Sequence, residues 1–111
     1  MSSNKVIVSA FAALVVFGAV MPAKSQSTYF SETNKTVAKI GAEGNRFYAS
    51  FAESVSQNCL YGILYISTDK KGLYVQLLAA KLANKHLSRV DYSQPGGSGT
   101  VCNVELVEIA E

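Results

Sequence analysis

Residues 60–92, LYGILYISTDKKGLYVQLLAAKLANKHLSRVDY, decide the fold, because a strand-like, a helix-like and another strand-like segment follow one another there. Residues 60–66 have the aromatic and β-branched side chains typical of a strand, and Gly62 inside them indicates a bulge or bend. Residues 71–83 are rich in Leu and Ala, contain no proline, and end near Asn84, which tolerates a left-handed C-cap. The pattern predicts one helix between two strands, the second over residues 87–92.

Strand-like segments continue on both sides of this unit. Residues 36–42 and 46–52 are separated by Glu43-Gly44-Asn45, which predicts a hairpin. In the second of these, alternation sets Phe47, Ala49 and Phe51 on one face and Tyr48 with Ser50 on the other. A glycine-rich loop over residues 93–100 then leads to a last strand, 101–109. In that strand we expect Cys102, Val104 and Leu106 to face one way and Asn103 and Glu105 the other.

The order of these elements is three strands, one helix and two strands, which is the order of the five-stranded OB barrel. We therefore expect an α+β fold, a small OB-like five-stranded barrel with its helix between the third and fourth strands. Ferredoxin-like and cystatin-like sandwiches are alternatives, but they place their helices elsewhere.

The N-terminal residues have the layout of a signal peptide. Lys5 precedes the uncharged apolar run 6–21, and the small residues Ala23 and Ser25 stand where a signal peptidase reads its site. We predict a signal peptide over residues 1–25, cleavage after Ser25, and a secreted or periplasmic product. An uncleaved membrane anchor is the alternative, but the run is short for a spanning helix, so we expect no membrane span after cleavage.

Composition excludes several classes of protein. A chain of 111 residues, 49% hydrophobic and 16% charged, is neither disordered nor collagen-like and has room for one small domain. Cleavage would remove Lys5 and Lys24, two of the ten basic residues, and none of the eight acidic ones. The mature chain would then be formally neutral, so we expect no nucleic-acid partner. Within it, residues 26–35 read as a polar N-terminal arm and residues 36–111 as one globular domain.

The two cysteines, Cys59 and Cys102, predict a disulfide. A small exported domain has a thin core, and a covalent bond between distant residues offsets this weakness. A redox pair usually has CxxC spacing, and a zinc site would need further cysteines or histidines nearby.

Catalytic chemistry finds little support in the sequence. His86, the only histidine, follows the predicted helix, where a histidine more often caps carbonyls than abstracts protons. Arg89 and Asp91 are spaced for a surface ion pair, whereas Glu105 and Glu108 do not share a face of a regular strand. We therefore expect no enzyme activity, no metal and no cofactor.

Binding has more support, in the loop that follows the fourth predicted strand. The segment SQPGGSGT, residues 93–100, exposes hydroxyl and amide groups beside an aromatic residue. Our candidate ligand-binding residues are Tyr92, Ser93, Gln94 and Ser98. An ordinary flexible hairpin loop is the alternative interpretation.

The predicted helix has two apolar arcs, which one sheet cannot cover together. Leu73 and Leu77 form one arc, and the other contains Tyr74, Val75, Leu78 and Leu82. We assign Leu73 and Leu77 to an oligomer face, covered by a neighbouring subunit, with the N-terminal arm as the alternative cover.

Residues 73–96, LYVQLLAAKLANKHLSRVDYSQPG, followed by a strand that carries a cysteine, resemble the pentameric B subunits of bacterial AB toxins of the subtilase-cytotoxin kind. They are also similar to small exported bacterial proteins of unassigned role. The resemblance implies an OB-like barrel, a ring of five copies and binding of cell-surface glycans. It carries over no sugar-contact residue. We expect a non-enzymatic binding module with a glycan or protein partner, or, as the alternative, a structural or accessory envelope protein without a small ligand.

Overall fold

The structure is a computed structural model that describes residues 28–110, so the predicted signal peptide lies outside the described residues. Between residues 28 and 110, six strands, one α-helix and two short 3-10 helices follow one another. They are β1 (Tyr29–Lys35), β2 (Val37–Glu43), β3 (Arg46–Phe51), η2 (Leu60–Gly62), β4 (Leu64–Ser67), η3 (Thr68–Lys70), α1 (Lys71–Ala83), β5 (Leu87–Ser93) and β6 (Cys102–Ile109). Within residues 28–110, no helix has both the length and the apolar character needed to cross a bilayer.

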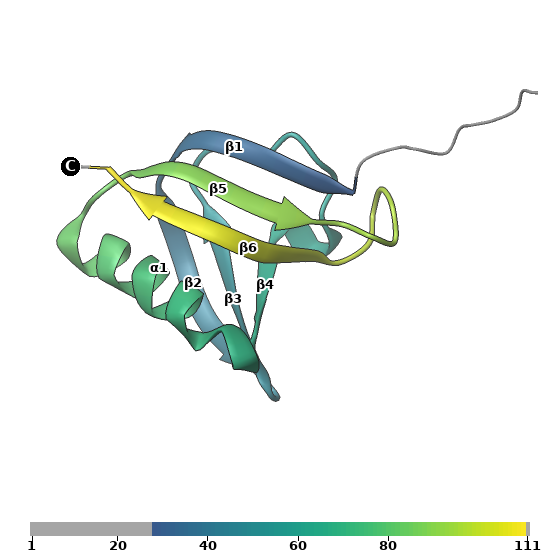
Figure 1. Ribbon diagram of the computed structural model, residues 1–111, viewed down its shortest axis with the longest axis horizontal. Coiled ribbons are helices and arrows are strands. Elements are labelled where there is room, and N and C mark those ends of the chain that lie inside the picture. Colours follow the sequence, from purple (N-terminus) through teal and green to yellow (C-terminus); the bar gives the residue numbers. More distant parts are fainter. Residues whose placement is uncertain (1–27, 111) are drawn as a thin grey trace, which may run out of the picture.

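The strands form one mixed sheet in the order β1-β5-β6-β4-β3-β2. All neighbours are antiparallel except β4 and β6, which are parallel. Figure 1 shows the sheet bent into two layers, with β1, β5 and β6 in one, β2, β3 and β4 crossing behind them, and α1 along one end. The predicted α+β class is confirmed. The expected count of five strands is wrong, and the sheet is not closed.

The extra strand is β1, which occupies the segment that we expected to be a polar arm. It pairs with β5 along its length, from Tyr29 opposite Ser93 to Lys35 opposite Leu87. The ring of Phe30 packs 5.8 Å from that of Tyr92. Backbone pairing with β5 orders this polar segment, because unpaired N–H and C=O groups at a sheet edge gain hydrogen bonds in this way.

Helix α1 has the predicted bounds, and Asn84 is its left-handed C-cap, with φ of 58°. Its orientation differs from our expectation. Leu77 is 0% exposed in the core, Leu73 packs against that core, and Leu82 is 77% exposed. The expected oligomer face at Leu73 and Leu77 is therefore wrong, because the sheet itself covers this arc.

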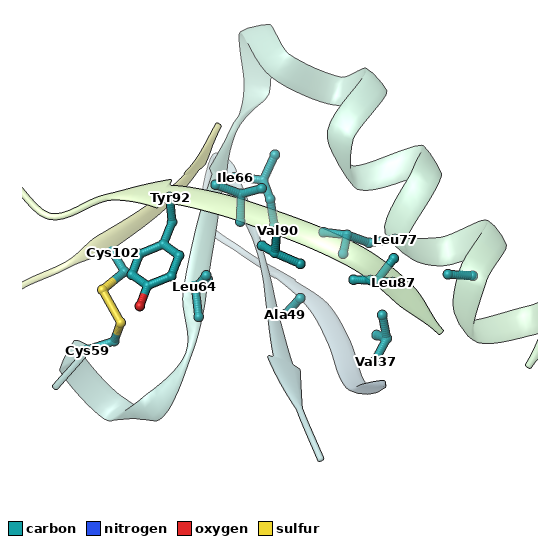
Figure 2. Packing of buried hydrophobic residues seen from close by; sticks show 12 residues of the cluster. Val37, Ala49, Cys59, Leu64, Ile66, Leu77, Leu87, Val90, Tyr92 and Cys102 are labelled. Carbon is teal, nitrogen blue, oxygen red and sulfur yellow. A yellow bond between two sulfur atoms is a disulfide. The ribbon is translucent and has the colours of Figure 1, made fainter. Parts of the chain in front are cut away.

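The core lies between the two layers and the helix. Figure 2 shows Leu77 beside Leu87, and the disulfide beside the ring of Tyr92. The predicted bond between Cys59 and Cys102 is confirmed, with an S–S distance of 2.03 Å. It joins the start of β6 to the residue just before η2.

A bulge in β6 overturns one predicted strand face. Tyr92 lies opposite Val104 but Asp91 lies opposite Leu106, so Glu105 is an extra residue in β6. One extra residue reverses the facing of everything beyond it. Leu106 therefore shares the outer face with Asp91, and Val107 packs against the core in its place.

Candidate ligand-binding site

Tyr92, a predicted ligand residue, lies in the core. Its side chain is 0% exposed, and its hydroxyl donates to Glu32 Oε2 at 2.7 Å. Burial and this hydrogen bond raise the pKa of Tyr92 to about 12. Burial opposes the charge of Glu32, but hydrogen bonds from Tyr92 and from the Ser56 N–H and hydroxyl outweigh it and lower the Glu32 pKa. This network, partly buried at Tyr92 and exposed at Ser56, ties β1 to the segment after β3.

The other predicted ligand residues are mostly structural as well. Ser93 and Gln94 are buried, and Gln94 Nε2 donates to the carbonyls of Asn58 at 2.8 Å and Thr100 at 3.1 Å. The glycine-rich loop is therefore held from inside by an amide side chain. Of the four predicted residues, only Ser98 is exposed.

A different surface gathers aromatic side chains, on the outer face of β2, β3 and β4. Tyr48 lies opposite Tyr65 in the β3–β4 pair, so both point to the same face. Tyr61 from η2 joins them. Glu43 and Arg46, at the two ends of the β2–β3 turn, complete what we call the tyrosine site. Its hollow has a volume of about 380 Å³ and is lined by Ala42, Glu43, Tyr48, Tyr61, Ile63 and Tyr65.

Tyr48 rests on a glycine of the neighbouring strand. Gly41 lies opposite Tyr48, and a Cβ atom at position 41 would come within 2.6 Å of Tyr48 Cζ. The ring therefore occupies the space that a side chain would need, a cross-strand arrangement known to stabilise glycine in sheets.

Tyr65 is the buried support of the site. Its hydroxyl donates to Glu43 Oε1 at 3.0 Å, and the Arg46 guanidinium lies 3.7 Å from its ring centroid. Burial and the hydrogen bond to Glu43 raise the pKa of Tyr65. A buried tyrosine with a cation over its ring fixes both charged side chains at the rim.

Tyr61 is the exposed member of the site. Its side chain is 76% exposed, and its backbone has φ of 61° and ψ of 9°, in the left-handed region. For a bulky residue this conformation is a costly outlier that the surrounding structure must hold in place. Neighbouring hydrogen bonds do so, from Leu60 N–H to the Thr100 carbonyl at 3.0 Å and from Gly62 N–H to the Cys59 carbonyl at 2.9 Å. The disulfide anchors the same turn.

His86, the only histidine, lies beside the hydroxyl of Thr36, which also binds Glu53. Thr36 donates its hydroxyl to Glu53 Oε2 at 2.9 Å, and His86 Nδ1 lies 2.9 Å from the same hydroxyl. Since the hydroxyl proton goes to Glu53, the hydrogen of the second bond belongs to Nδ1. The Thr36 N–H also donates to Glu53, and these bonds lower the Glu53 pKa. The cluster fixes the corner between β1 and β2. Because Nδ1 of His86 donates in it, this nitrogen cannot take a proton from the Thr36 hydroxyl.

The remaining polar candidates are in surface ion pairs or in a surface hydrogen bond. Arg89 and Asp91 pair at 2.7 Å, as their spacing predicts. Glu105 pairs with Lys70 from η3, whereas the carboxylate of Glu108 accepts a hydrogen bond from Ser88, so the two acids have separate partners.

No known protein-family model matches the chain, and no curated protein matches it. The resemblance of residues 73–96 to toxin B subunits therefore stays an expectation.

Proposed function

We propose that this protein is a small exported, non-enzymatic binding module that takes a glycan at the tyrosine site. The observation that carries the proposal is Tyr61, an exposed aromatic side chain on a left-handed backbone turn beside a hollow. Ring faces such as those of Tyr48 and Tyr61 cover the apolar face of a sugar, while polar groups at the rim fix its orientation. Glu43 and Arg46 supply these polar groups.

We also propose that the fold is OB-like. Only Thr36 separates β1 from β2, so the two edge strands of the sheet are consecutive in the chain. Taken as two halves of one bent strand, they reduce the six strands to the five of the OB barrel, with α1 between the third and fourth. Ligands of OB folds lie on the face of the second and third strands, which here are β3 and β4 with Tyr48 and Tyr65.

A glycan array with the mature protein tests the proposed ligand class. We expect binding to a subset of glycans, and at least tenfold weaker binding for Tyr61→Ala and Tyr48→Ala. Tyr29→Ala is the matched control, since Tyr29 is exposed on β1, three strands away from Tyr65 in the sheet order. Array binding to no glycan, or capture of a peptide ligand at the same tyrosines, would contradict the proposal. If the protein binds no small ligand, the result would favour the alternative function, that of a structural or accessory envelope protein.

Export and association of copies complete the proposed function. Intact-mass analysis of the exported protein should give a chain that begins at Gln26, and retention of residues 1–25 would refute cleavage. Association rests on the resemblance, because Leu77 is in the core and offers no interface. Light scattering tests it, and a clean monomer at high micromolar concentration would rule out the ring of copies.

A further inference from the structure

We propose that the tyrosine site selects a neutral sugar with two adjacent hydroxyl groups and discriminates against acidic sugars. This inference rests on the proposed function and names the ligand class of the same site. It follows from how the charges and hydrogen bonds of Glu43 and Arg46 are already used.

Tyr65 engages only part of the Glu43–Arg46 ion pair. Its hydroxyl donates to Glu43 Oε1, and its ring packs against one face of the Arg46 guanidinium. Arg46 Nη2 lies 3.8 Å from Glu43 Oε1, and the two side chains are 42% and 58% exposed, respectively. Among the described residues, none donates a hydrogen bond to Glu43 Oε2. A carboxylate oxygen and guanidinium N–H groups therefore stand side by side, both open to a ligand.

This pair of groups matches a vicinal diol. One hydroxyl can donate to Glu43 Oε2 while its neighbour accepts from an Arg46 N–H, and each hydrogen bond then includes a charged partner. Because the carboxylate only accepts and the guanidinium only donates, a ligand must offer both a donor and an acceptor to bind both groups.

The charge balance of the site disfavours an acidic ligand. Glu43 lines the hollow and Arg46 lies beside it with the opposite charge, and the rest of the lining consists of tyrosine, alanine and isoleucine side chains. A sugar carboxylate near Arg46 would also lie near Glu43, so attraction and repulsion nearly cancel. The cost of taking the anion out of water then remains without compensation.

The shape of the site fits a terminal sugar. A volume of about 380 Å³ lies toward the small end of ligand pockets, which run from about 300 to 1,000 Å³. The exposed ring of Tyr61 and the ring of Tyr48 offer apolar surfaces to the C–H groups of one sugar ring.

Titration of matched glycans tests the selection, with neutral hexose-terminated oligosaccharides against the same oligosaccharides capped with sialic acid. We expect the neutral members to bind at least tenfold more tightly. Glu43→Gln should weaken neutral binding about tenfold, because it replaces a charged acceptor with a neutral one. The variant should stay folded, since its amide oxygen can still accept from Tyr65. Glu108→Gln, an exposed carboxylate change on β6, is the matched control and should leave binding unchanged.

The sign of the Glu43→Gln effect decides the inference. If acidic sugars are the true ligands, this substitution removes a repulsion and strengthens binding, which would overturn the inference but leave the glycan-binding function intact. Neutral binding that is unchanged by Glu43→Gln would overturn it as well. Absence of binding to every glycan would instead overturn the proposed function.

Discussion

Loss of the Cys59–Cys102 bond should cost a large share of the stability of this domain. The two residues are 43 positions apart, and closing a loop of that length in the unfolded chain corresponds to about 4 kcal/mol at 25 °C. Domains of this size are stable by roughly 5–15 kcal/mol in total. Replacement of both cysteines by Ala should cost about 1 kcal/mol more than reduction alone, because buried sulfur volume is lost from the core.

Denaturant unfolding followed by far-UV circular dichroism measures these differences. Three samples suffice, the oxidised protein, the reduced protein and the Cys59→Ala, Cys102→Ala double variant. The reduced sample keeps the sulfur atoms, so it separates the effect of the loop from that of packing. A free energy of unfolding that changes by less than about 1 kcal/mol on reduction would refute the loop-entropy reasoning. Reduction should also weaken glycan binding, since the bond anchors the turn that holds Tyr61.

Three further predictions concern the core, the pH dependence and the proposed site. Leu77→Ala should cost about 2–5 kcal/mol in thermal or denaturant unfolding, whereas the exposed Leu82→Ala should stay within about 0.5 kcal/mol, and equal effects would contradict the assigned helix faces. The folded-state pKa of Glu32 is lowered from its usual 4.5, so its contribution to stability is present above that value and is lost as pH falls through the folded pKa. Between pH 7 and 3, the free energy of unfolding should therefore fall less steeply for Glu32→Gln than for the unmodified protein. Gly41→Ala should displace the ring of Tyr48 and weaken glycan binding, and an unchanged affinity with an unchanged fold would separate Tyr48 from the site.

Local signals in the sequence were sufficient for the helix, the β2–β3 hairpin and the last two strands, but not for β1 or for residues 60–62, which form the 3-10 helix η2 where a strand was expected. The Leu- and Ala-rich run without proline predicted α1 with its bounds, and Asn84 predicted its left-handed end. Alternation in residues 46–52 placed Tyr48 on the face opposite Phe47 and Ala49, as the pairing with β4 confirms. The two cysteines alone predicted the disulfide, since only one intramolecular pairing exists. Each of these features depends on residues close in sequence or on simple counting.

The site depended on contacts that no local pattern encodes. Tyr92, at the end of a predicted strand, and Gln94, in the loop that follows, were expected to meet a ligand, but their partners Glu32 and Asn58 come from distant segments that fold over them. Tyr61 was missed because its left-handed backbone is imposed by the surrounding turn and not by the preference of tyrosine.

By itself, the sequence determined the α+β class, the helix and the disulfide. Propensity and periodicity are properties of short segments, and two cysteines allow only one intramolecular pairing. Only the tertiary structure decided which arc of α1 is buried, that residues 29–35 pair as an edge strand, and that Leu106 faces outward. Two apolar arcs of one helix are equivalent until a sheet is present to cover one of them. A polar segment is ordered only when a neighbouring strand supplies hydrogen bonds, and one bulge residue reverses a strand face without any change in composition.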